Sequence, residues 1–172
     1  MINKHYQKGA ETVEFAIIAL LFFAIIFAII EFGRALFVWN ALTEATRRGA
    51  RMAVICPYQS PIPKQVAIYD VIAGSLGTSP IIADLTPAMI NVSYLDETGI
   101  ATANQTLIKF VQVSIDVSPD AGYQHRLIIP LWGRPITFSP ATVAFTTTLY
   151  SESLGTIPTI RPAAPEPTAC NF

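Results

Sequence analysis

An uninterrupted apolar run near the N-terminus constrains this chain more than any other feature. From Phe15 to Ile30 no side chain is charged or polar. As an α-helix the run is roughly 24 Å long, slightly less than the hydrocarbon core of a bilayer at about 30 Å. A helix that is apolar on every side needs either lipid or a very large core to cover it. The run therefore predicts a membrane-spanning helix.

The helical pattern continues beyond the run and lengthens the predicted span. Glu31 and Arg34 are three residues apart on one face, so they can partly neutralise each other. The long arginine side chain can also reach toward the headgroups. With this polar collar, a span from about Phe15 to Val38 fits a bilayer.

The whole helix is expected to be much longer than the span. It is predicted to run from Ala10 to about Ile55, because Pro57 stops it and restrains Cys56 toward an extended conformation. A helix of this length measures about 69 Å. Its second half must therefore project out of the membrane.

Three interpretations of the N-terminus compete. The basic leader with Lys4 and Lys8, followed by an apolar run, is typical of a cleaved secretory signal peptide. No small-x-small cleavage site follows the run, where the chain reads IEFGR from Ile30. The alternatives are an uncleaved signal anchor and a cut before the run, between Gly9 and Ala10, which leaves the apolar helix on the mature protein.

The residues around this junction resemble the processing site of type IV pilins. The stretch from Gly9 to Phe15 reads GAETVEF. In those proteins prepilin peptidase cuts after the glycine, and the fifth mature residue is glutamate. Ala10 would then be the first mature residue and Glu14 the fifth. The resemblance implies a nine-residue leader, residues 1–9, and processing determined by Gly9, Ala10, Glu14 and Phe15.

A longer stretch resembles the TadE-like family, which comprises pseudopilins or minor pilins of the tight-adherence (Flp-type) pilus system. The resemblance covers about residues 8–55 and is carried by VEFA, the apolar run, IEFGR, and the pairs Ala41-Leu42 and Ala50-Arg51. Many members carry a proline where this chain has Leu20. Because proline kinks a helix, its absence predicts a straighter span.

Glu14 is the one acidic residue at the inner edge of the run. A carboxylate at the lipid edge is costly unless it is paired. The resemblance implies that its partner is the free amine of Ala10, on the same or a neighbouring subunit, and that the pair sets the axial register of subunits. The alternative is that Glu14 lies among the headgroups and interacts favourably with the N-terminal end of the helix dipole.

Small residues recur every four positions on the helix and allow close packing. Beyond the span, this ridge offers a surface either to the chain's own folded domain or to another subunit, and the first is favoured. Within the span, the same spacing favours contact between helices in lipid. The predicted packing and assembly residues are Ala24, Ala28, Glu31, Gly33, Arg34, Ala41, Ala45, Gly49 and Ala53.

The positive charges give a conflicting indication of orientation. Four arginines, at 34, 47, 48 and 51, follow the run, against two lysines before it. The positive-inside rule alone would place the C-terminal side in the cytoplasm. The pilin resemblance implies the opposite: a single-pass protein of the bacterial inner membrane with a cytoplasmic N-terminus and an extracytoplasmic C-terminal domain. Long translocated domains follow the charge rule only weakly, so we adopt the second orientation.

Residues 57–172 are predicted to form one small α+β domain, which makes the fold pilin-like. The proline-rich stretch from Tyr58 to Pro63 is expected to be a linker, followed by a short helix from Val66 to Ala73. Hydrophobic residues then alternate with polar ones in three segments, from Ile90 to Tyr94, from Leu107 to Val117 and from Thr142 to Tyr150. These segments predict an antiparallel sheet of three or four strands packed against the long helix. A proline-rich tail begins at about residue 154.

The two cysteines lie at opposite ends of this domain. Cys56 follows the helix and Cys170 is in the tail. If the domain is outside the cytoplasm, a disulfide between them can form and persist. Two unrelated buried thiols are the alternative, because sequence spacing alone does not bring the two residues together.

The chain lacks the residue patterns of a catalytic or metal site. It has two histidines, His5 in the leader and His125, which is expected to be a surface side chain. No phosphate-binding loop, zinc spacing or GxSxG occurs. The net charge of −1 does not suggest a nucleic-acid partner. We predict no enzymatic activity, no cofactor, no metal and no small-molecule substrate.

The resemblance implies a structural component in the biogenesis of a tight-adherence, type IVb-like pilus that serves adhesion and surface colonisation. The implied partners are membrane lipid, prepilin peptidase, and other pilins, pseudopilins and assembly proteins. Whether the protein enters the filament or stays at its base is left open. The alternative is an uncleaved single-span protein whose outer domain is an adhesin or binding module.

Overall fold

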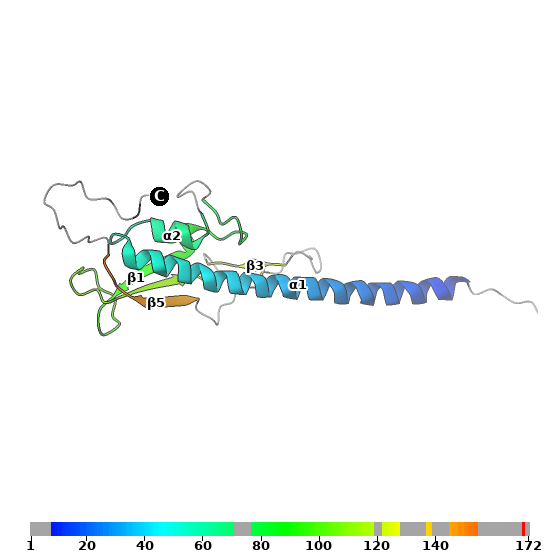
Figure 1. Ribbon diagram of the computed structural model, residues 1–172. Helices are drawn as coiled ribbons and strands as arrows, with labels where there is room; N and C mark the ends of the chain where they lie inside the picture. The colour runs from blue at the N-terminus through cyan, green and yellow to red at the C-terminus, as the bar shows by residue number, and fades with distance from the viewer. Residues whose placement is uncertain are drawn as a thin grey trace, which may run out of the picture.

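One continuous helix, α1 (Lys8–Ile55), forms the axis of the molecule (Figure 1). The computed structural model describes residues 8–70, 77–118, 122–127, 137–138, 145–154 and 170. No proline interrupts the sequence of α1. The helix ends where it was predicted to end, with the amide of Cys56 donating to the carbonyl of Met52 at 2.9 Å just before Pro57.

The domain is built around the second half of α1. A three-stranded antiparallel sheet consists of β1 (Ile90–Leu95), β2 (Phe110–Ile115) and β5 (Thr146–Tyr150), in the order β1-β2-β5. The central strand pairs Val113 with Val92 on one side and with Thr147 on the other. The predicted α+β class with a small antiparallel sheet is therefore confirmed.

The alternating pattern located the strands correctly but overestimated the length of β2. Val111, Val113 and Ile115 are buried, as the period of two predicted. Leu107 instead lies in a turn, where its amide donates to the carbonyl of Asn104 at 3.0 Å. Of the predicted third strand, residues 146–150 form β5, Phe145 precedes it, and residues 142–144 lie outside the described part of the chain.

The turn that follows β1 has the conformation that its residue types favour. Asp96 Oδ1 accepts hydrogen bonds from the backbone amides of Thr98 and Ile100, at 2.8 and 3.0 Å. Gly99 has a φ of 82°, a left-handed conformation that suits glycine. These contacts lower the pKa of the Asp96 carboxyl, the side-chain hydrogen bond from Thr98 contributing most.

The short helix of the domain begins earlier than predicted. α2 (Ile62–Ala67) starts within the proline-rich segment that was expected to be a linker, with Pro63 in its first turn, where the missing N–H costs nothing. It ends before Tyr69, whose φ of 65° breaks the helical path. The expected continuation to Ala73 is thus wrong as far as residue 70, and residues 71–76 lie outside the described part.

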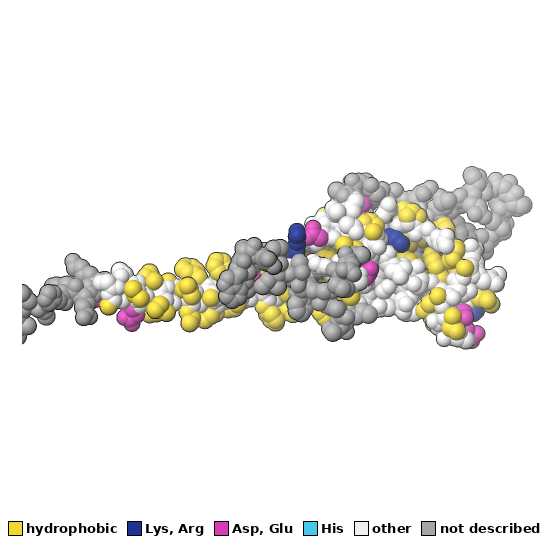
Figure 2. Space-filling view, turned by 180° about the vertical axis from the view of Figure 1, so that it is seen from behind, with side chains coloured by type: hydrophobic (Ala, Val, Ile, Leu, Met, Phe, Trp, Pro, Cys, Tyr) yellow, Lys and Arg dark blue, Asp and Glu magenta, His cyan; other side chains and the backbone are white. Residues whose placement is uncertain are grey.

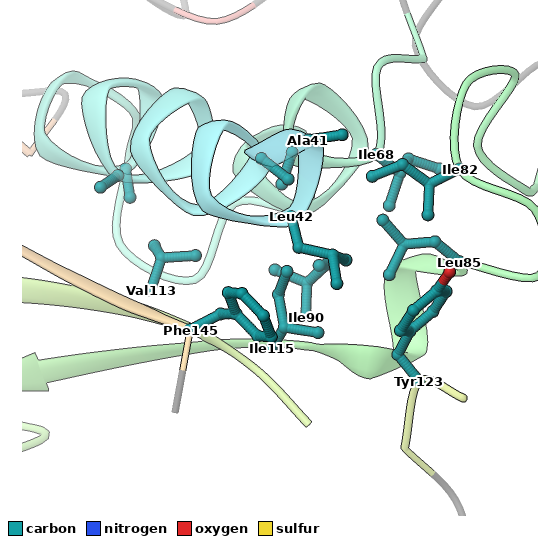
Figure 3. Packing of buried hydrophobic residues seen from close by; sticks show 14 of the residues in the cluster. Ala41, Leu42, Ile68, Ile82, Leu85, Ile90, Val113, Ile115, Tyr123 and Phe145 are labelled. Carbon is teal, nitrogen blue, oxygen red and sulfur yellow. The ribbon is translucent and has the colours of Figure 1, made fainter. Parts of the chain in front are cut away.

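α1 lies between the sheet and α2 and supplies much of the core. Leu42 points at the sheet and lies near Ile90, Ile115 and Phe145 (Figure 3). Beside them Ile68, Ile82 and Leu85 fill the space on the α2 side, next to Tyr123. A hydrogen bond of 2.9 Å between the hydroxyls of Thr46 and Thr147 ties the helix to β5 inside this core.

A second, two-stranded sheet lies closer to the apolar half of α1. It consists of β3 (His125–Arg126) and β4 (Thr137–Phe138), which pair antiparallel. β3 lies beside α1 at the level where the domain begins (Figure 1).

Candidate functional site

The predicted processing segment occupies the first turns of α1. Gly9 and Ala10 are exposed, and the hydroxyl of Thr12 donates to the carbonyl of Gly9 at 2.9 Å. Glu14 is also exposed, and Phe15 is 73% exposed. The structure thus places the four predicted processing residues together on an accessible helix end.

The apolar half of α1 projects away from the domain without cover from the described residues. Hydrophobic side chains line it on all sides, as the space-filling view shows for one face (Figure 2). By length and composition, α1 is the one helix among the described residues that could cross a membrane. It is suited to serve as a single-pass membrane anchor.

The small residues of this half are left accessible by the part of the domain that the structure describes. Ala24 and Ala28 are exposed, and a β-carbon placed on Gly33 would meet nothing within 4 Å. These three residues leave the helix surface accessible to another helix.

A polar cluster marks the point where the domain meets α1. Arg34 forms an ion pair with Glu31 at 2.8 Å and also donates to the carbonyl of Arg126 in β3. His125 Nε2 lies 3.4 Å from the same carboxylate, longer than the usual hydrogen-bond distance. We name Glu31, Arg34, His125 and Arg126 the collar cluster.

The expectation of a surface histidine is wrong. His125 is 8% exposed, because β3 presses its side chain against α1. Burial lowers its pKa, and the nearby positive charge of Arg34 lowers it further, while the Glu31 carboxylate acts in the opposite direction. The sequence held no signal for this contact, because the two residues that meet are far apart in the chain and belong to no periodic pattern.

The small-residue ridge of the outer half is buried by the chain's own domain. Ala45 and Ala53 are fully buried, and Ala41 is 9% exposed. A β-carbon on Gly49 would lie 3.2 Å from Val113 Cγ1 of β2 and 3.3 Å from the carbonyl oxygen of Pro63 in α2. The ridge therefore serves to bring the sheet and α2 close to the helix.

Two contacts beside the ridge were not foreseen from the sequence. The hydroxyl of Tyr69 donates to the carbonyl of Ala41 at 2.8 Å, and Arg48 lies over the Tyr69 ring at 4.8 Å. Burial raises the pKa of this tyrosine. Both contacts depend on the left-handed backbone after α2, which no pattern in the sequence indicates.

The tail returns to the end of α1. Cys56 and Cys170 form a disulfide with a Cα–Cα distance of 5.6 Å, and both side chains are buried. The amides of Ser153 and Leu154 also donate to the carbonyl of Val54, at 3.3 and 3.2 Å. The disulfide and these hydrogen bonds thus attach Ser153, Leu154 and Cys170 to the C-terminal end of α1.

Comparison with known proteins identifies the first part of the chain. Residues 9–51 match the family model described as TadE-like protein. The chain is TadE-like over this segment. The match covers the predicted processing segment, the apolar half of α1 and the ridge residues Ala41, Ala45 and Gly49. No curated protein and no solved structure matches the chain.

The TadE-like match gives the segment a coarse function. The TadE-like family consists of structural pilus components, so the match over residues 9–51 suggests a pilus-related role and pilus-related partners. The domain beyond residue 51 lies outside the match. Within the described residues, no group of three or more histidine, cysteine or acidic side chains could hold a metal ion.

Proposed function

We propose that this chain is a minor pilin or pseudopilin that acts, without catalysis, in the biogenesis of a tight-adherence, type IVb-like pilus. Prepilin peptidase removes the leader, residues 1–9. The helix of residues 10–56, with a span of about 15–38, then holds the protein in the inner membrane. Residues 57–172 form the extracytoplasmic domain. The pilus serves adhesion and surface colonisation.

One observation carries this proposal. The domain is packed on one half of α1, and the other half, which follows Gly9 and Glu14, is an uncovered apolar helix. Lipid can cover that half in the membrane, and the helices of neighbouring pilins can cover it in a filament. A plain anchor needs neither the glutamate nor a rigid, unbroken connection to the domain.

The disulfide supports the proposed orientation. The bond between Cys56 and Cys170 joins two buried cysteines of the domain. Disulfides persist in oxidising compartments and are rare in the cytosol. An extracytoplasmic domain agrees with this bond, although the arginines at 34, 47, 48 and 51 would favour the opposite orientation by charge alone.

The deciding experiment is the intact mass and N-terminal sequence of the protein from its native membrane, with and without the cognate prepilin peptidase. We expect a mature chain that starts at Ala10 only when the peptidase is present. A chain that keeps residues 1–9 under both conditions would overturn the proposal. The uncleaved anchored adhesin or binding module would then be the better explanation.

Gly9→Leu provides a matched control. A β-carbon at this position meets no atom within 4 Å, so the substitution leaves the fold intact. We expect the variant to insert normally and to keep its leader in the presence of the peptidase. Cleavage of wild type and variant at equal rates would show that the cut does not depend on this glycine.

A further inference from the structure

The apolar surface of α1 ends at different positions along the helix axis on two of its faces. About 100° per residue separates positions on a helix, so residues spaced by three, four or seven share a face. The β3 face, against which β3 lies, carries Val13, Leu20, Ala24, Phe27, Glu31, Arg34 and Val38. The Trp39 face, roughly a third of a turn away, carries Glu14, Leu21, Ile25, Phe32, Leu36 and Trp39.

On the β3 face the apolar surface ends at Glu31. The carboxylate there pairs with Arg34, and Arg34 donates to the backbone of Arg126. Paired charges and strand backbone are costly to place in hydrocarbon. Lipid chains on this side therefore reach no further than Glu31.

On the Trp39 face the apolar surface continues for more than one further turn. Phe32 and Leu36 are 66% and 49% exposed, so the domain leaves them largely uncovered. Trp39 follows with 40% exposure, because one side of its ring packs against Phe145 at 5.0 Å between ring centroids. Tryptophan is enriched where a membrane meets water. From Glu31 to Leu36, the two faces thus lose their apolar character about 8 Å apart along the axis.

At the N-terminal end of the span, the apolar surface also begins further outward on the Trp39 face than on the β3 face. Glu14 lies on the Trp39 face, whereas Val13 on the β3 face is apolar. If a helix crosses a bilayer at a right angle, each membrane surface meets all faces of the helix at the same position along its axis. If the helix is tilted, both membrane surfaces meet the face toward which its outer end leans at positions closer to that outer end. Interfacial anchors determine the direction of tilt.

We infer that the membrane surface crosses α1 obliquely, at Glu31 on the β3 face and just beyond Leu36 on the Trp39 face, so that β3 rests on the lipid headgroups. The inference depends on the membrane anchoring that the proposed function assumes. The helix leans toward its Trp39 face, which is covered by lipid chains. The exposed side chain of Arg126 then lies at the height of the lipid phosphates, and the collar cluster limits how deep the protein can sink.

Leu36 and Phe37 offer a test with a built-in control. They are adjacent, so their heights differ by about 1.5 Å, but they point to different sides of the helix. Leu36 is on the Trp39 face, and Phe37 lines a cavity with Ile81 and Arg126. Both are about half exposed, at 49% and 56%, so tryptophan fits at either position.

The experiment uses Leu36→Trp and Phe37→Trp in full-length chains whose own tryptophans are removed by Trp39→Phe and Trp132→Phe. Each variant is reconstituted into phosphatidylcholine vesicles with bromine either near the headgroup or near the middle of the acyl chain. We expect a higher ratio of deep to shallow quenching for Leu36→Trp. Equal ratios, or a higher ratio for Phe37→Trp, would overturn the oblique boundary.

A third variant, Phe22→Trp, separates this inference from the proposed function. If Phe22→Trp is quenched and neither of the other two is, the domain stands clear of the bilayer and the inference fails while the anchor stands. If none of the three is quenched, the membrane span itself is wrong and both proposals fail.

Discussion

The β-carbon that Gly49 lacks would lie 3.0 Å from the β-carbon of Ala67. At this point α1 and α2 are closer than two ordinary side chains allow, and Val113 of β2 approaches from the sheet side. The domain is thus held on α1 at a place where only a glycine fits without displacement.

Gly49→Val should therefore destabilise the domain, by about 1–3 kcal/mol, because the added methyl groups overlap well-packed neighbours. Gly33→Val is the control, since it makes the same change in the same helix where nothing lies within 4 Å. Its effect should stay within about 0.5 kcal/mol. Urea unfolding of both variants in detergent, followed by tryptophan fluorescence, measures the difference. Equal stabilities would contradict the tight contact.

Glu14→Ala should leave membrane insertion intact and prevent assembly. Removing a carboxylate from the lipid edge makes insertion easier, so the protein should remain in the membrane fraction. If Glu14 sets subunit register, pili sheared from the cells should lack the variant or be fewer. Glu11→Ala removes an acid one turn earlier in the same exposed helix end and serves as the control. Normal piliation with Glu14→Ala would count heavily against the pilin mechanism.

The disulfide should contribute about 2–5 kcal/mol to the stability of the domain, because it closes a long loop in the unfolded chain. The two cysteines are 114 positions apart. The double variant Cys56→Ser with Cys170→Ser should unfold at lower urea concentration than the wild type. A reductant should lower the unfolding midpoint of the wild type to that of the variant and leave the midpoint of the variant unchanged. A wild type that does not respond to reductant would show that the bond is dispensable.

Acidification should weaken folding through His125. Its pKa is lowered in the folded state, mainly by burial, so the unfolded chain binds the proton more readily. The stability is complete above the unfolded pKa of about 6.5 and declines as the pH falls toward the folded value. Glu31 and Arg34 are the charged groups that face the ring.

His125→Gln should remove this part of the pH dependence. Thermal unfolding of both proteins between about pH 7.5 and 5 isolates the histidine, because every other titratable group is present in both proteins. We expect the wild type to lose more stability than the variant over this interval. If the stability of the two proteins falls equally with pH, protonation of His125 does not contribute to the pH dependence of folding.

The elements that were predicted well depend on local information. α1 ends at Ile55 because Pro57 cannot continue a helix, and this is visible in the sequence. β1 and β2 were found from their alternation, which reflects burial of one side of each strand. The start of α2 was missed because prolines indicate linkers as readily as first helical turns.

The sequence by itself determined the apolar helix and the α+β class, because these depend on periodicity and helix breakers. The processing segment, read from a contiguous motif, stays a prediction. Only the tertiary structure decided that the ridge around Gly49 packs against the chain's own domain, that Cys170 reaches Cys56, and that His125 lies against Glu31. These contacts join residues far apart in the chain. Their geometry follows from how the sheet, α2 and the helix pack together, and no local pattern encodes that packing.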